Sequence, residues 1–190
     1  PDGLKLIEDI EQHKNSKPSH LALINADAFK DINDLYGYET GDEILIKISK
    51  KVREFCHDSN HVYKLPNDEL AIFTTSNITE NDFFEMISNL LYKINEINFS
   101  VAEQSIFVSF SCGIASNKSS LLVKANTALQ IAKKQSKSIV VYESSLNTKE
   151  QITKNVDALL ILKDAIKSNH IVPYYQPIYN TRTKKIEKYE

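Results

Sequence analysis

Apolar residues repeat along the chain with two periods, one typical of helices and one typical of strands. Helical spacing of three and four residues runs through 4–10, 44–56, 83–97 and 121–132. Runs of consecutive or β-branched apolar residues, typical of strands, occupy 21–24, 62–65, 69–74, 106–110 and 139–142. The predicted order is therefore helix, strand, helix, two strands, helix, strand, helix, strand.

This interleaving predicts the α/β class, with helices covering a central mixed β-sheet. The two adjacent strands flank Pro66-Asn67-Asp68-Glu69, a turn sequence that predicts an antiparallel hairpin within the sheet. Between the first strand and the second helix, Gly37 and Gly41 predict a loop. Thr40 and Glu43 have the capping-box form and predict the start of that second helix. Gly113 predicts the end of the strand at 106–110.

After Tyr142 the composition becomes that of a linker, and a further helical pattern covers 152–166. Ile171–Tyr179 follows, with two prolines that favour an edge strand, and then a turn and a returning strand. We expect a first domain at 1–143, a linker and connecting helix at 144–168, and the beginning of a second domain at 169–190. The helical pattern begins directly after Pro1-Asp2-Gly3 and the last pattern breaks off, so we expect an excised piece of a longer protein.

Composition narrows the classes of function. The 190 residues are 42% hydrophobic and carry 23 Lys plus Arg against 25 Asp plus Glu, a net charge of -2. This balance argues against a nucleic-acid binder, which usually has a basic face. No apolar run reaches the roughly 18 residues that span a bilayer, and no signal peptide is visible. We therefore expect no membrane contact by this fragment and a cytoplasmic location, with an anchor elsewhere in a longer protein left open.

Three polar clusters fall at predicted strand ends and helix starts, where α/β domains place functional groups. They are Asn25-Ala26-Asp27, Asp42-Glu43 and Asp68-Glu69. If the first strand and the hairpin are neighbours, the first and third clusters approach a common point. Their oxygens are ligands that Mg²⁺ prefers, which would predict a phosphoryl-transfer site. The alternative treats the acids as a turn former, a helix-dipole charge and a solvated side chain, and composition alone favours that alternative.

Four motifs stand in order along the first domain: Asn25–Gly37, Gly41–Glu43, Lys64–Leu70 and Ala132–Ser138. In sequence and spacing they resemble the GGDEF domain family, the diguanylate cyclases, over residues 1 to about 143. The residues from Leu162 onward resemble the start of an EAL domain, the cyclic di-GMP phosphodiesterases, because Tyr175–Ile178 matches that family's Tyr-Gln-Pro-Ile. Gln176 and Glu190 correspond to EAL-type site residues, but the chain stops at Glu190 and that site is incomplete.

The resemblance implies a set of ligands and roles. In an active cyclase, two GTP-loaded domains meet face to face, which implies a homodimer. The metal positions match Asn25, Ala26 and Asp68, and Glu69 is the second acid of the signature. The residues that recognise guanine match Asn33 and Asp42, and the basic pair on the phosphates matches Lys133 and Lys137. GTP and Mg²⁺ are thus the implied ligands.

Departures from the family pattern decide which function we expect. Pro66 and Asn67 stand where active members have two glycines, and we expect their side chains to crowd the nucleotide. Asn25 is a neutral amide in place of a metal-binding carboxylate, Ser136 replaces a glycine, and Lys137 replaces an arginine.

We therefore expect a degenerate signature in which Asp68 and Glu69 are vestigial and Mg²⁺ binds weakly if at all. The expected role is a regulatory module, GTP-sensing or dimerising, that acts on its own EAL domain in a longer protein and has no enzymatic activity in this fragment. Two alternatives stay open: a weakly active diguanylate cyclase and a purely structural module without ligand.

Overall fold

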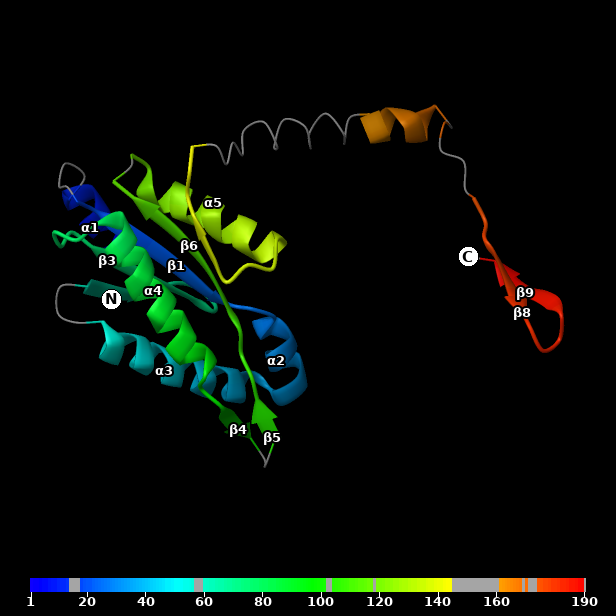
Figure 1. Ribbon diagram of the computed structural model, residues 1–190, viewed down its shortest axis with the longest axis horizontal. Helices are drawn as coiled ribbons and strands as arrows, with labels where there is room; N and C mark the ends of the chain where they lie inside the picture. Colours follow the sequence, from blue (N-terminus) through cyan, green and yellow to red (C-terminus); the bar gives the residue numbers. More distant parts are fainter. Residues whose placement is uncertain are drawn as a thin grey trace. The chain divides into compact units, whose positions relative to one another are not determined.

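The structure is a computed structural model, and it describes residues 1–13, 18–56, 60–101, 104–117, 119–144, 161–168, 170 and 174–189 (Figure 1). The chain forms two compact units, Pro1–Ser144 and Ser145–Glu190. The first unit contains α1 (Gly3–Gln12), β1 (His20–Ala26), α2 (Phe29–Tyr36), α3 (Tyr38–Phe55), β2 (Asn60–Lys64), β3 (Glu69–Thr74), α4 (Glu80–Asn95), β4 (Phe99–Val101), β5 (Gln104–Ile106), β6 (Phe110–Ser116), α5 (Leu121–Lys134) and β7 (Ile139–Val141).

A five-stranded sheet in the order β2-β3-β1-β6-β7 forms the centre of the first unit. β1 lies antiparallel to both β3 and β6, and β2 is antiparallel to β3, whereas β6 and β7 run parallel. The predicted mixed sheet with an inserted hairpin is therefore confirmed. β4 and β5 form a separate two-stranded sheet.

Helices cover both faces of the sheet and bury a core on each (Figure 1). Successive side chains of a strand point to opposite faces. Along β1, Ala22 and Ile24 therefore pack with α2, α3 and α4 in one core, and Leu21 and Leu23 pack with α1 and α5 in the other. Every residue of β1 is buried, which explains its nearly continuous apolar sequence.

The loop predicted between the first strand and the second helix is wrong, because most of it is helical. Phe29–Tyr36 forms α2, and α3 already begins at Tyr38. Gly37 separates the two helices with φ +86°, a conformation that side chains disfavour. Thr40 therefore lies inside the first turn of α3 and does not cap it; the capping box of this unit is formed by Thr79 and Asp82 at the start of α4.

The strand predicted at 106–110 is also displaced. β5 ends at Ile106, and β6 of the five-stranded sheet runs through Phe110–Ser116 with Gly113 in its middle. A Cβ on Gly113 would lie 2.2 Å from the carbonyl oxygen of Ala125 and 2.2 Å from the backbone nitrogen of Leu129. Glycine is present because α5 packs directly against the backbone of β6, and it does not end the strand.

In the second unit, residues 161–167 are helical, and β8 (Pro177–Asn180) pairs with β9 (Lys185–Tyr189) in an antiparallel hairpin. Most of the predicted connecting helix, and the start of the predicted strand at 171–173, lie outside the described residues.

Candidate functional site

A hollow of about 1110 Å³ opens at the end of β1. Strand ends, the start of α2, the hairpin turn and the segment after α5 all contribute to its wall. Six of the positions that match metal or nucleotide ligands of the family line it: Asn25, Ala26, Asn33, Asp68, Lys133 and Lys137. These positions come together because β1 lies between β3 and β6 in the sheet.

The three positions that match metal ligands lie together. Asn25 is only 3% exposed and stands opposite Glu69 of β3 and Ser111 of β6 in the sheet register. The backbone N–H of Ala26 donates to the carbonyl oxygen of Asp68 at 3.4 Å, which links the strand end to the hairpin turn. The amide of Asn25 and the carboxylate of Asp68 therefore face one hollow.

The two positions that match guanine-binding residues have different surroundings. Asn33 of α2 lines the hollow, and within the described part of the chain its Oδ1 is buried without a hydrogen-bond partner. Gly41 lies against this oxygen so closely that a Cβ there would be 1.9 Å away. Asp42 is exposed and lines a separate hollow of about 750 Å³ between α3 and the hairpin, together with Lys64 and Asn67. Only Asn33 of the pair is placed in the main hollow.

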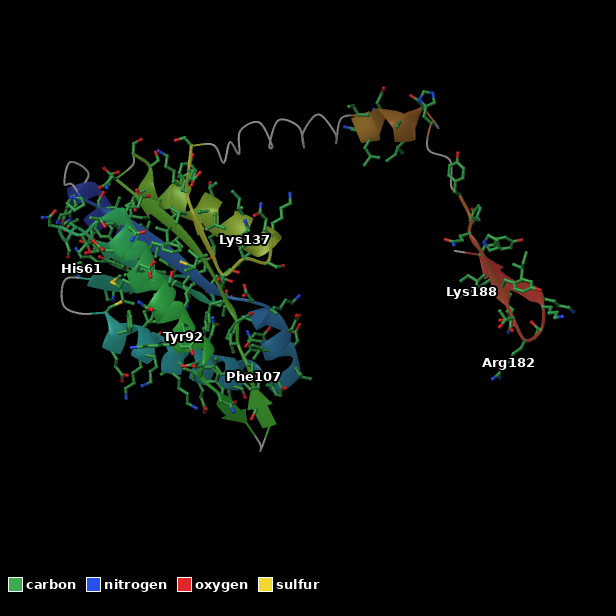
Figure 2. All side chains as sticks on the ribbon, viewed as in Figure 1. His61, Tyr92, Phe107, Lys137, Arg182 and Lys188 are labelled. Carbon is green, nitrogen blue, oxygen red and sulfur yellow. The ribbon has the colours of Figure 1, made fainter. Side chains whose placement is uncertain are left out.

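Three lysines border the main hollow. Lys133 lies in the last turn of α5, and Lys137 follows the residue pair that leads the chain out of that helix (Figure 2). Ser136 has φ +52°, so the backbone keeps a left-handed conformation without a glycine. Lys30, which sequence reasoning did not single out, lines the same hollow from α2. All three are exposed and could contact an anion.

Asp27, which belongs to the first predicted polar cluster, has a structural role. Its carboxylate accepts hydrogen bonds from Ser109 Oγ at 2.9 Å and from Ser111 Oγ at 2.7 Å, and its N–H donates to the Ser109 carbonyl at 2.8 Å. These bonds hold the end of β1 against the start of β6 beneath the hollow. The only sequence signal for this role is an acid two residues after Asn25.

The hairpin turn has Pro66 and Asn67 where the resemblance implies two glycines. Asn67 takes φ +61°, the left-handed conformation in which Asn is, after Gly, among the best tolerated residues. Pro66 lines another groove of about 500 Å³ beside α1 and is not part of the main hollow. Asn67 does line the main hollow, and the expectation that both side chains crowd a nucleotide stays a prediction.

The surroundings of the turn disfavour the charged form of the Glu69 carboxyl. Burial raises the pKa of the Glu69 carboxyl, with Asp68 adding to the shift and Lys133 and Lys64 opposing it. Among the described residues, no three His, Cys, Asp or Glu side chains cluster as a metal site would need. With a neutral amide at Asn25, the donor set fits a resident divalent cation poorly.

Of the two EAL-type residues, the structure describes only Gln176. Gln176 is exposed directly before β8, and Glu190 lies outside the described residues. In the part of the chain that is described, no helix is both long and apolar enough to cross a membrane.

Comparison with known proteins identifies the family of the first unit. Residues 4–138 match the family model described as "Diguanylate cyclase, GGDEF domain". The signaling protein YkoW of Bacillus subtilis is 26% identical over 170 residues, 86% of this chain and 21% of that protein. MucR of Pseudomonas aeruginosa, a bifunctional diguanylate cyclase/cyclic di-GMP phosphodiesterase, is 26% identical over 189 residues, 93% of this chain and 27% of MucR. The chain thus spans less than a third of the length of these relatives.

Solved structures agree on the fold. The GGDEF domain of PA1120 (YfiN or TpbB) from Pseudomonas aeruginosa superposes with a TM-score of 0.66 at 23% identity, covering 75% of this chain and 96% of that one. A diguanylate cyclase/phosphodiesterase from Caldicellulosiruptor saccharolyticus gives a TM-score of 0.63 at 24% identity, covering 71% of this chain and 83% of that one. The mixed sheet with helices on both faces is the fold of these domains. By its match over most of its length, this chain belongs to the GGDEF domain family.

Proposed function

We propose that the first unit is a catalytically degenerate GGDEF domain that binds GTP and regulates a longer cyclic di-GMP signalling protein. The observation that carries the proposal is the state of the hollow at the end of β1. It is open, it is lined by Asn33, whose Oδ1 is buried without a hydrogen-bond partner among the described residues, and it is bordered by Lys30, Lys133 and Lys137. A buried polar atom without a partner is costly in a folded protein, so a ligand that bonds to it is favoured.

The same site argues against efficient catalysis. Cyclisation of GTP in this family relies on metal ions held between the strand end and the turn, and here Asn25 replaces the carboxylate. Asp68 remains, but Glu69 sits where burial favours its neutral form. We therefore expect Mg²⁺ to bind weakly and the domain to recognise a nucleotide without converting it.

Isothermal titration with GTP in the presence of Mg²⁺ tests the proposal. We expect saturable heat for GTP, loss of that heat in Asn33→Ala, and much weaker heat for ATP, because the amide of Asn33 would bond the guanine edge. Absence of heat across millimolar GTP would leave a structural module as the explanation.

A weakly active diguanylate cyclase is the second candidate, and the retained acidic turn favours it. Asn67 keeps the left-handed backbone at the turn, and Asp68 still lines the hollow. DosC of Shigella sonnei, named a diguanylate cyclase, is 30% identical over 141 residues, 70% of this chain and 30% of DosC. Incubation with labelled GTP separates the candidates, because turnover that disappears in Asp68→Ala would establish the cyclase.

The regulated partner is proposed to be the protein's own EAL domain. Residues 162–190 resemble the start of such a domain, and MucR carries both activities in its name. Measuring phosphodiesterase activity of the longer protein with and without GTP would test the coupling; equal rates would contradict it.

A further inference from the structure

The first helix, α1, packs on the sheet with few apolar contacts. Of its ten residues only Leu6 is buried, whereas Leu4 is 75% exposed and Ile7 is 49% exposed. These two exposed side chains line the groove of about 500 Å³ beside the helix, together with Leu65 and Pro66 of the hairpin turn. In contrast, α4 buries five of its sixteen residues. Because the free energy of local opening rises with the apolar surface that an element buries, we expect α1 to open more readily than α4.

A polar contact also holds α1 on the sheet. The hydroxyl group of Tyr63 in β2 donates to Asp9 Oδ2 at 2.6 Å, and Lys5 Nζ lies 3.0 Å from Asp9 Oδ1. Tyr63 is fully buried in the same core as Leu6. Leu6 and Asp9 are three residues apart and therefore lie on the same face of the helix. The attachment of α1 thus depends largely on Leu6 and on one hydrogen bond to a charged acceptor, which is stronger than a bond between neutral groups.

The residues that begin α1 are bonded to the end of β2. The N–H of Lys64 donates to the Pro1 carbonyl at 3.0 Å, and Asp2, the N-cap of α1, forms a parallel bridge with Lys64. Gly3 lies so close to Leu65 that a Cβ on this glycine would be 3.2 Å from the Leu65 side chain. Any movement of the start of α1 must therefore break or shift contacts at Lys64 and Leu65.

These two residues also hold the hairpin turn. The N–H of Leu65 donates to the Glu69 carbonyl at 2.9 Å, and Lys64 Nζ donates to the carbonyl oxygens of Leu65, at 2.8 Å, and of Asn67. Asp68 follows directly and lines the main hollow. The start of α1 is therefore linked to the position of Asp68 through two adjacent residues.

We propose that α1 is a conformational strap: it opens as one unit while the rest of the first unit stays folded, and its opening loosens the turn that carries Asp68. Elements that move in switching come from the least stable parts of a fold, and α1 has the sparse burial that this requires. A signal that holds or releases α1 would then change the wall of the main hollow. The proposal adds an input to the regulatory role but does not depend on nucleotide binding.

Hydrogen exchange of the nucleotide-free protein, followed for single amides by NMR, tests the proposal. We expect the amides of α1 to exchange at least about tenfold faster than those of α4 in the wild-type chain. Tyr63→Phe keeps the buried ring and removes the bond to Asp9. It should speed exchange throughout α1 by about tenfold, as expected for loss of one hydrogen bond to a charged group. The Leu65 amide, which reports on the hairpin turn, should be accelerated by the same factor, and α4 should not change.

Two further variants sharpen the experiment. Tyr92→Phe is the matched control, because it removes a hydroxyl group from a tyrosine of α4 that is 66% exposed, and it should leave exchange in α1 and at Leu65 unchanged. Asp9→Asn keeps an acceptor for Tyr63 but removes its charge, so it should accelerate α1 less than Tyr63→Phe does.

Three outcomes would overturn the proposal. Equal exchange in α1 and α4, or equal acceleration of both in Tyr63→Phe, would mean that α1 unfolds only with the whole unit. Exchange in α1 that does not respond to Tyr63→Phe would exclude the contact with Asp9 as what holds the helix. Acceleration of α1 without acceleration at Leu65 would show that the turn does not follow the helix. Because no GTP is present, none of these outcomes depends on whether the domain binds a nucleotide.

Discussion

Each end of β1 carries a buried polar residue, His20 at one end and Asn25 at the other. The two ends differ in whether the polar atoms around these residues all have hydrogen-bond partners. At one end, His20 is 0% exposed, stacks on Phe83, and has both ring nitrogens bonded. Its Nδ1 lies 2.8 Å from Ser116 Oγ and its Nε2 3.1 Å from the Ile78 carbonyl. At the other end, Asn25 borders an open hollow that Asn33 also lines, and the Oδ1 of Asn33 is buried without a hydrogen-bond partner among the described residues.

This difference separates a structural polar group from a functional one. A buried group whose partners are all supplied by the fold contributes to stability and has no capacity left for a ligand. A group whose partner is missing costs stability until a ligand binds. We therefore expect substitutions at the His20 end to change unfolding, and substitutions at the Asn33 end to change binding.

The largest effect should come from Gly113→Ala, which would disrupt both ends together. Gly113 stands opposite Leu23, midway along β1, and a Cβ there would meet the backbone of α5 at 2.2 Å. Backbone cannot rotate away as a side chain can, so we expect a loss of more than about 3 kcal/mol in the free energy of unfolding. Urea denaturation followed by circular dichroism measures it.

Gly3→Ala is the control for that experiment. Its Cβ would approach the side chain of Leu65 at 3.2 Å, and that side chain can move. A Gly113→Ala variant no less stable than Gly3→Ala would show that α5 does not pack on β6 as described.

The next largest effect should come from His20→Ala. We expect a loss of about 2 kcal/mol in the free energy of unfolding, because the change leaves a cavity beside Phe83 and removes the donor to the Ile78 carbonyl. GTP binding by the folded variant should be unchanged. Urea denaturation and isothermal titration on the same preparation check both statements, and a binding defect would contradict the separation of the two ends.

The same histidine predicts how stability depends on pH. Burial lowers the pKa of His20 below its ordinary value of 6.5, although the hydrogen bond to the Ile78 carbonyl and the charge of Glu80 oppose the shift. The unfolded chain then binds more protons than the native one as the pH falls. The contribution of His20 to the free energy of unfolding is therefore complete above pH 6.5 and is lost as the pH falls through the folded-state pKa. Urea midpoints across this range should fall less in His20→Gln than in the wild type; equal falls would contradict the assignment.

A smaller effect on stability, with a large one on binding, should follow Asn33→Ala. Its Oδ1 is buried with no partner within the described residues, so its removal should not destabilise the fold and should raise the free energy of unfolding by up to about 1 kcal/mol. GTP affinity should fall at least about tenfold, since one hydrogen bond to the base is lost. Isothermal titration and urea denaturation together provide the check. An unstable variant with intact binding would reverse the comparison.

Long apolar patterns were enough to predict most of the sheet and the larger helices. The strands β1 and β3 and the helices α4 and α5 could be recognised because each buries a continuous face. α2 was missed because eight residues rich in charge give a weak pattern. Gly113 was misread because its reason for being glycine lies in another element, α5.

The site could be predicted in part for a similar reason. Motif spacing placed Asn25 and Asp68 at neighbouring strand ends, and the sheet order brings both to one hollow. The bonds of Asp27 to two serines and of Lys64 to the turn carbonyls depend on strand register and side-chain conformation, which no local pattern encodes. Asp42, which the resemblance pairs with Asn33 at the guanine, lines the other hollow together with Lys64.

The smallest effect should follow Asn67→Gly, and it tests whether the rebuilt turn is strained. Asn67 has φ +61°, which glycine adopts without a steric cost, whereas asparagine meets a mild one. The gain is partly offset by the greater freedom of glycine in the unfolded chain, so we expect stabilisation of no more than about 0.5 kcal/mol. Asn67→Val should instead lose about 1 kcal/mol, because β-branched residues avoid this conformation. Urea denaturation of the pair measures the difference, and tolerance of valine would mean that the turn can leave the left-handed conformation. In that case the hydrogen bond from Lys64 Nζ to the Asn67 carbonyl would not fix the turn that carries Asp68. The contrast between a rigid His20 end and a prearranged hollow at the other end of β1 would then fail.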